Sequence, residues 1–235
     1  MSKKKIMLMV LVLTLVTLSL VASAKLNDGT YSVRGKVDSH GYYPSITLVV
    51  KGNKIASVDY NEVVATDNKP KAKGVYPYAA YFTAVETLNK KAVEVNGDLD
   101  KIDAVASASL TTASFKEMLF WALVKATPLK NTTYKGIKYP ADSRGYKPTM
   151  QVTVEKGKIT KIEYAEVKEA DGKAKEKGVY KYDAYFDAIE TLPKKIVEAG
   201  GIPTEVDGFA GATQTSTKFF ELYKAYMAAI YKVSK

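Results

Sequence analysis

Apolar and polar side chains alternate in two stretches of the chain, at residues 46–50 and 150–154. This period of two is typical of a half-buried β-strand, because successive side chains of a strand point to opposite faces. A short glycine-containing turn, at 52–53 or 156–157, and a second apolar stretch follow each of them, which predicts two β-hairpins. The apolar positions are Ile46, Leu48, Val50, Val58 and Tyr60 in the first hairpin and Met150, Val152, Val154, Ile162 and Tyr164 in the second.

Each predicted hairpin is followed by two stretches with helical spacing. The first lies within 81–88 or 185–192, and Pro193 predicts that the later of these helices ends there and that a shorter one begins. The second has the i, i+3, i+4, i+7, i+8 spacing of an amphipathic helix with one core-facing stripe. Its apolar positions are Phe115, Met118, Leu119, Ala122 and Leu123, and then Phe219, Leu222, Tyr223, Tyr226 and Met227. Antiparallel strands covered by helices predict an α+β fold.

The second half of the chain repeats the first. Gly41-Tyr42 recurs as Gly145-Tyr146, and Phe115 recurs as Phe219, both 104 positions later. A repeat of this length is a domain rather than a solenoid unit. We therefore expect two tandem copies of one small domain, at residues 25–126 and 128–235, with a short link around Thr127-Pro128.

The first 24 residues have the pattern of a signal peptide. Three lysines at positions 3–5 precede an apolar stretch at 6–21, and Ala22-Ser23-Ala24 is a small-x-small cleavage site. The alternative is an uncleaved membrane anchor, but the apolar stretch is shorter than the roughly 20 residues that a span needs. We expect cleavage and export, with the mature chain beginning at Lys25.

Composition limits the chemistry of an exported chain of this kind. There is no cysteine, which excludes a lipoprotein anchor, disulfides and thiolate metal sites. The formal net charge is +10, of which the predicted signal carries 3, so the mature chain has +7. Such a charge either attracts the chain to anionic polymers and lipids of the cell envelope or only solvates its surface. No nucleic-acid motif is present, and export argues against nucleic acid as the partner.

The segment before each final helix is rich in small and hydroxyl residues. It reads DGFAGATQTS at 207–216 and DAVASASLTT at 103–112. Small residues let a backbone approach a ligand closely, and N–H groups at a helix N-terminus bind anions. The segment is therefore either a phosphate site or an ordinary loop with a helix cap, for which Ser114 and Glu117 have capping-box spacing.

The later segment resembles a known signature. Asp207-Gly208-x-x-Gly211-Ala212-Thr213 is similar to the flavinylation motif of the FMN-binding domain family. That family includes flavin-carrying subunits of the sodium-pumping NADH:quinone oxidoreductase and the Rnf complex, and exported tandem-domain proteins of extracellular electron transfer. Asp28-Gly29-Thr30-Tyr31, the hairpins and the closing helices are similar as well, so the resemblance covers essentially both domains.

This resemblance implies a role for each motif residue. Thr213 would carry FMN through a phosphoester, and Asp207 would belong to the signal read by a flavin transferase. Gly211 and Ala212 would let the transferase and the phosphate approach. Thr215 and Ser216 would cap the helix and donate to the phosphate. Tyrosines that would line the isoalloxazine ring, or simply pack the cores, are Tyr42, Tyr81, Tyr146 and Tyr185.

The chain departs from the family pattern in two places. Ala210 stands where the family usually has Ser or Thr, and the first copy has Ala104, Ser107 and Ser109 at the positions of Gly208, Gly211 and Thr213. The first copy would bind FMN weakly, carry a second FMN on Ser109, or be only structural. Its other candidate cofactor residues are Asp103, Thr111 and Thr112.

The resemblance implies an exported flavoprotein that carries electrons and is not a self-contained enzyme, because the flavin supplies the chemistry. Its electron donors would be membrane quinone or flavoprotein modules. One alternative is a flavin-free surface-binding or structural module, and another is a reductase with its own substrate. The single histidine, His40, has Arg144 as its counterpart, which argues against a Ser-His-Asp site or a histidine metal site.

Overall fold

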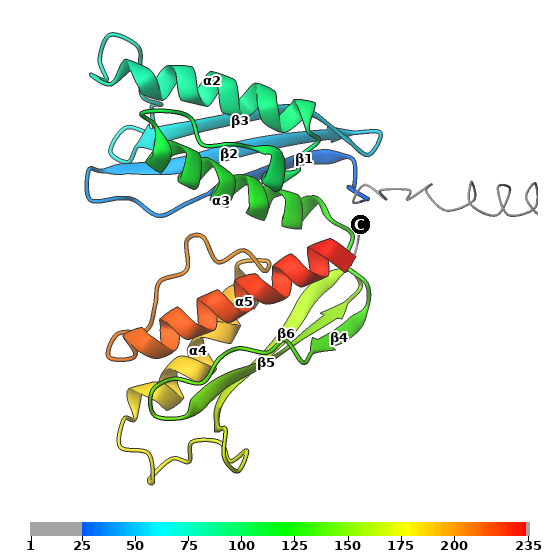
Figure 1. Cartoon of the computed structure of the whole chain (residues 1–235), viewed down its shortest axis with the longest axis vertical. Helices are drawn as coiled ribbons and strands as arrows, with labels where there is room; N and C mark the ends of the chain where they lie inside the picture. The colour runs from blue at the N-terminus through cyan, green and yellow to red at the C-terminus, as the bar shows by residue number, and fades with distance from the viewer. Residues whose placement is uncertain (1–24, 234–235) are drawn as a thin grey trace, which may run out of the picture.

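The structure is a computed structural model that describes residues 25–233, arranged as two α+β units (Figure 1). We call residues 25–126 the N-terminal unit and residues 128–233 the C-terminal unit. The described residues form two three-stranded antiparallel sheets and four α-helices, so the α+β prediction is confirmed. The signal peptide predicted at 1–24 lies outside the described residues. No helix of the described part is long and apolar enough to cross a membrane.

The two units have the same order of elements. The N-terminal unit contains β1 (Gly29–Arg34), β2 (Tyr42–Lys51), β3 (Lys54–Val64), α2 (Ala79–Glu94), a 3₁₀ turn (Leu99–Lys101) and α3 (Ser109–Ala126). The C-terminal unit contains β4 (Thr132–Lys135), β5 (Tyr146–Glu155), β6 (Lys158–Lys168), α4 (Ala184–Glu198) and α5 (Thr213–Val233). The strand orders are β1-β2-β3 and β4-β5-β6, with antiparallel pairing throughout.

Both predicted hairpins are present and have equivalent registers. Each has a bulge near the turn, between Val49 and Val50 in one and between Thr153 and Val154 in the other. The two turn residues have positive φ in each hairpin: +59° and +63° at 52–53, and +50° and +72° at 156–157. Two positive φ values define the type I′ turn, whose twist matches that of paired strands.

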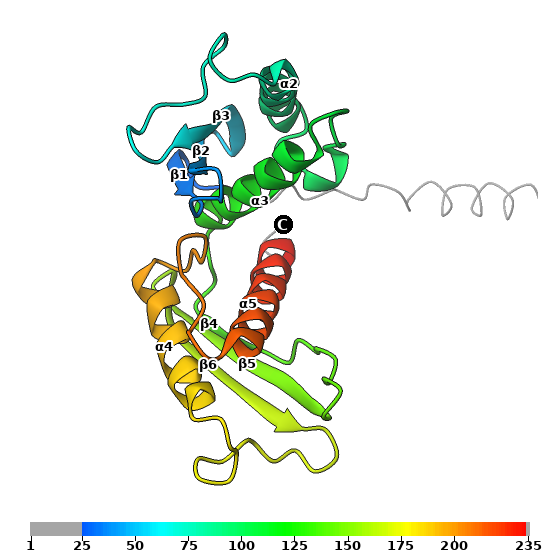
Figure 2. The ribbon, with the colours of Figure 1, turned by 90° about the vertical axis from the view of Figure 1, so that its left-hand side faces the viewer.

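Both helices of a unit cover the same face of its sheet (Figure 2). Ile46, Leu48 and Val50 point to that face and are fully buried. Tyr60 meets Phe115 edge to face at 5.4 Å in the N-terminal core, and Tyr164 meets Phe219 in the same way at 5.4 Å in the C-terminal core. The predicted core-facing stripes of α3 and α5 are therefore confirmed.

Three local predictions are wrong. Pro193 does not end a helix, because α4 continues through it to Glu198. A proline lacks the N–H donor and its ring crowds the carbonyl four residues earlier, but the buried Leu192 and Ile196 on either side hold the helix against the sheet. Ser114 forms no capping box with Glu117, since α3 already begins at Ser109. The third is the polar outer face predicted for α3: its core-facing stripe is present, but residues outside the stripe are buried as well.

Helix α3 is buried on nearly all sides because the C-terminal unit covers its outer face. Trp121 is 1% exposed, and its ring stacks on Tyr223 of α5 at 6.1 Å with an interplanar angle of 10°. Glu117 accepts a hydrogen bond from Trp121 Nε1 and pairs with Lys224 of α5. The strip of α3 that the sequence pattern would leave to solvent is thus an interface between the units.

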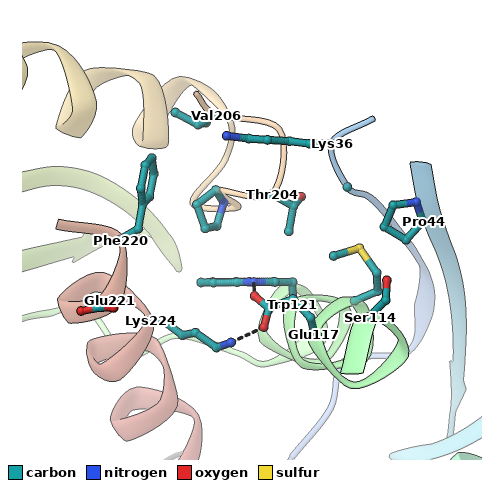
Figure 3. Close-up of a pocket in the computed structure, with 13 residues that line it drawn as sticks. Lys36, Pro44, Ser114, Glu117, Trp121, Thr204, Val206, Phe220, Glu221 and Lys224 are labelled. Atoms are coloured by element: carbon teal, nitrogen blue, oxygen red, sulfur yellow. Dashed lines mark hydrogen bonds and ion pairs between the residues drawn. The ribbon is translucent and has the colours of Figure 1, made fainter. Parts of the chain in front are cut away.

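A cavity of about 440 Å³ lies in this interface (Figure 3). Pro44, Ser114 and Trp121 line it from the N-terminal unit, while Thr204 and Phe220 line it from the C-terminal unit. Beside it, Arg34 pairs with Glu205 at 3.4 Å, and the Arg34 carbonyl accepts a hydrogen bond from Thr204 at 2.6 Å. The segment that precedes the candidate motif is therefore held against the first unit.

Candidate functional site

The motif 207–213 forms a tight loop that ends at the first residue of α5. Gly211 has φ +78°, and a Cβ built there would meet the Ala184 Cβ at 3.3 Å. The Ala212 N–H donates to the Phe209 carbonyl at 3.1 Å, which closes the turn. Thr213 follows as the exposed first residue of α5. The loop thus presents the Thr213 hydroxyl at a helix N-terminus, where free N–H groups favour an anion.

Ser216 holds this loop from inside. Its hydroxyl accepts a hydrogen bond from the Phe209 N–H at 2.9 Å and donates to the Ala212 carbonyl at 3.0 Å. Ser216 and Thr215 are both buried. The single hydroxyl proton of Ser216 is therefore engaged within the protein, which differs from the expected donation to a phosphate.

The N-terminal unit forms the same loop from different residues. Thr112 takes the place of Ser216, with its hydroxyl accepting from Val105 N–H at 3.1 Å and donating to the Ala108 carbonyl at 3.0 Å. Ser107 takes the place of Gly211 and has φ +59°, and Ser109 begins α3. The N-terminal unit thus has the same loop conformation although it lacks the signature residues.

Exchange of the residue at the positive-φ position tests this equivalence. We expect Gly211→Ser to destabilise the C-terminal unit by about 1–2 kcal/mol, because a side chain in the left-handed region is strained. The new Cβ also meets Ala184. We expect Ser107→Gly, the reverse change, to cost nothing or to stabilise the N-terminal unit. Urea denaturation of both variants measures the two effects, and a destabilising Ser107→Gly would contradict the strain argument.

A cavity of about 330 Å³ opens beside Thr213. Arg144, Tyr180, Tyr182 and Tyr185 form its wall opposite the loop. Its other lining residues are Gly211, Ala212, Gln214 and Thr215. Aromatic rings, a guanidinium and a helix N-terminus suit a ligand that is flat at one end and anionic at the other.

Two cations act on the mouth of this cavity. A hydrogen bond and the charge of Lys181, together with the charge of Arg144, lower the pKa of the Tyr182 phenol. Sequence reasoning missed Arg144, Tyr180 and Tyr182 as site residues. The repeat of Lys-Gly-Val-Tyr at 177–180 was a signal for Tyr180, but nothing in the pattern placed that loop next to Thr213.

Behind the cavity lies a buried cluster of charges. Glu166 is 1% exposed and accepts from Lys175 at 2.7 Å and from Lys218 at 3.1 Å. Lys218 also donates to Asp142 at 2.7 Å. Burial alone would raise the pKa of Asp142, but the bond from Lys218 and two backbone N–H groups lower it to about 2. The cluster is neutral, since two ammonium groups face two carboxylates.

Three tyrosines of the C-terminal unit contact the cavity beside Thr213, the buried charge cluster, or both. The rings of Tyr146, Tyr180 and Tyr185 surround the Lys175 ammonium at 4.8, 4.2 and 4.5 Å. Burial raises the pKa of Tyr185 to about 12, and its oxygen accepts from the Glu166 N–H at 2.9 Å. Tyr146 therefore packs on the lysine and does not line the cavity, while Tyr185 does both.

The remaining motif residues lie on the side that faces the N-terminal unit. Asp207 is exposed and pairs with Lys36 at 3.0 Å, which lowers its pKa. A Cβ built on Gly208 would meet the Ser216 Cβ at 3.2 Å, so this glycine permits the close approach of loop and helix. In the N-terminal unit Asp103 is likewise exposed.

Comparison with known proteins identifies this region. Residues 145–228, which run from the start of β5 into α5, match the family described as the FMN-binding domain. The C-terminal unit is thus similar to FMN-binding domains. The crystal structure of the CPE2226 protein from Clostridium perfringens is 28% identical over 43% of this chain and 88% of that chain, with a TM-score of 0.38. No curated protein matches the chain.

The residues beside Thr213 fit the cofactor of the family that this unit resembles. Thr213 places a hydroxyl at the start of α5, and Arg144 in the wall of the same cavity would supply positive charge for a phosphate. Tyr182 is 44% exposed although it is a large aromatic residue, and it stands at the mouth beside Tyr180. These two rings offer the flat apolar contacts that an isoalloxazine ring needs.

Proposed function

We propose that this protein is an exported flavoprotein that carries FMN covalently on Thr213 and transfers electrons outside the cytoplasm. The observation that carries the proposal is the placement of the Thr213 hydroxyl. It is exposed, begins α5 within the region that matches the FMN-binding domain, and faces a cavity lined by Arg144 and tyrosine rings. The predicted signal peptide supports export, and a covalent bond prevents loss of the cofactor to the medium.

The roles of the protein's groups follow from their positions. Thr213 Oγ1 forms the ester bond to the flavin phosphate, and its proton leaves to a base of the flavin transferase. That enzyme supplies an activated flavin phosphoryl donor whose leaving group departs from phosphorus. Arg144 would balance the charge of the phosphate, and Tyr180 and Tyr182 would offer aromatic contacts to the flavin ring. Bound FMN supplies one- and two-electron redox chemistry.

A carrier of this kind needs surfaces for its redox partners. The cavity at Thr213 is lined by the exposed Tyr182, so a ring held there would be within reach of another protein. Membrane quinone or flavoprotein modules are the proposed donors. The basic mature chain is attracted to the anionic cell envelope, where such modules reside.

Co-production with an exported flavin transferase tests the proposal. We expect the intact mass of the mature chain to rise by one FMN and a flavin spectrum to persist after denaturation. A colourless, unmodified chain that is folded by circular dichroism would overturn the proposal and favour a flavin-free surface module.

A further inference from the structure

The two units differ in charge at equivalent positions around their cavities. Arg144, Lys181 and Lys218 of the C-terminal unit correspond, 104 positions earlier, to His40, Pro77 and Ser114. All three replacements remove a cation, since the histidine is neutral at pH 7. His40, Pro77 and Ser114 nevertheless line the corresponding cavity of the N-terminal unit.

The carboxylates of the cluster are kept and are held in the same way. Asp38 accepts the N–H groups of His40 and Tyr42 at 2.8 and 2.9 Å. Asp142 accepts the two equivalent N–H groups at 2.9 and 3.0 Å. The Asp38 side chain therefore has the conformation that, in the C-terminal unit, receives the ammonium of Lys218.

Glu62 repeats the arrangement of Glu166. Its carboxylate accepts from the Tyr60 hydroxyl at 3.3 Å and from Lys71, and its N–H donates to the Tyr81 hydroxyl at 2.8 Å. The rings of Tyr42, Tyr76 and Tyr81 surround Lys71 as their counterparts surround Lys175. In the N-terminal unit, two carboxylates thus face one ammonium instead of two.

The N-terminal cavity also has more space, because Ser114 stands where the C-terminal unit has Lys218. The Lys218 ammonium lies between Asp142 and Glu166, at 2.7 and 3.1 Å, and its counterpart Ser114 has a far shorter side chain. The N-terminal cavity has a volume of about 960 Å³, against about 330 Å³ beside Thr213, and Asp38, Glu62 and Ser114 line it.

Large apolar side chains stand exposed around the mouth of this cavity. Tyr78 is 67% exposed, and Leu110, which replaces the polar Gln214, is 86% exposed. Both line the cavity. A ligand with an apolar body that covers them would remove apolar surface from water, which is favourable.

We propose that the N-terminal cavity binds an organic cation, with its ammonium between Asp38 and Glu62 and its apolar body against Tyr78 and Leu110. The ammonium takes the place that the Lys218 side chain has in the other unit. In the C-terminal unit the equivalent carboxylates, Asp142 and Glu166, both accept this primary ammonium. The same charges disfavour a phosphate, so Ser109 carries no second FMN.

Calorimetric titration with 4-phenylbutylammonium tests the proposal on the full mature chain at fixed salt. This probe has a four-carbon stem, like the lysine side chain, and an aromatic end. We expect saturable binding, and at least tenfold weaker binding of the uncharged 4-phenylbutanol. The result does not depend on FMN at Thr213, so it is independent of the proposed electron-carrier function.

Two variants locate the binding. Ser114→Lys rebuilds the arrangement of the C-terminal unit, and we expect it to abolish binding of the probe. Asp38→Asn removes one carboxylate with little change of shape and should weaken binding at least tenfold. No binding to the wild-type chain, equal affinity for 4-phenylbutanol, or unchanged affinity in the folded Asp38→Asn chain would each overturn the proposal.

Discussion

Replacement of Thr213 by alanine is expected to abolish covalent flavin entirely. The neighbouring hydroxyls cannot substitute, because Thr215 and Ser216 are buried and the Ser216 proton is engaged by the Ala212 carbonyl. The chain co-produced with the transferase should keep its unmodified mass and be colourless after denaturation. The fold should be unaffected, since the Thr213 side chain is exposed.

Three matched variants make this result specific. Thr213→Ser keeps a hydroxyl at the same atom and should retain part of the flavin load. Thr217→Ala removes an exposed hydroxyl one turn later, which donates only to the Thr213 carbonyl at 3.1 Å, and should leave the load unchanged. Ser109→Ala should also leave it unchanged. Retention of a full equivalent of FMN by Thr213→Ala would place the attachment elsewhere and refute the assignment.

The parts of the fold that the sequence predicts correctly are those that depend on neighbouring residues. The alternation at 46–50 and the turn at 52–53 define a hairpin, because strand faces and turn conformation are local properties. The stripe from Phe115 to Leu123 likewise follows from helical geometry.

Predictions failed where distant contacts decide. Trp121 falls outside the predicted stripe of α3, and it is buried because α5 of the other unit covers it. Pro193 lies inside α4, since packing of its neighbours against the sheet outweighs the missing hydrogen bond and the crowding by the proline ring. The contact of Trp121 with α5 leaves no periodic signal in the sequence, whereas the spacing of Leu192 and Ile196 continues the helical period across Pro193.

In the candidate site, too, the part made of neighbouring residues was predicted and the part made by distant contacts was not. The motif 207–213 is contiguous and was found from its residues, and the family match covers it. The wall of the cavity is not contiguous, because Arg144 precedes β5, Tyr182 precedes α4, and only the fold brings them to Thr213. Because lysines and glutamates are mostly exposed in proteins, the sequence gave no indication that Lys175 and Glu166 form a buried pair.

That buried cluster leads to the second large effect, which concerns stability. We expect Glu166→Gln to destabilise the C-terminal unit by about 3–5 kcal/mol, the typical cost of removing one partner of a buried ion pair. Lys175 has 4% of its side chain exposed, so its ammonium would face a neutral amide without access to water. Urea denaturation followed by circular dichroism measures the change.

The equivalent variant of the other unit is the control. Glu62 has 15% of its side chain exposed and pairs only with Lys71, whereas Glu166 is 1% exposed and pairs with two lysines. Glu62→Gln should therefore cost less, about 1–3 kcal/mol, because water replaces part of the lost interaction. Since the two glutamates share strand position and tyrosine partners, the difference between the variants isolates burial and the second ammonium. Equal losses would mean that Lys218 adds nothing to the cluster, and the charge contrast between the two units would then have no energetic basis.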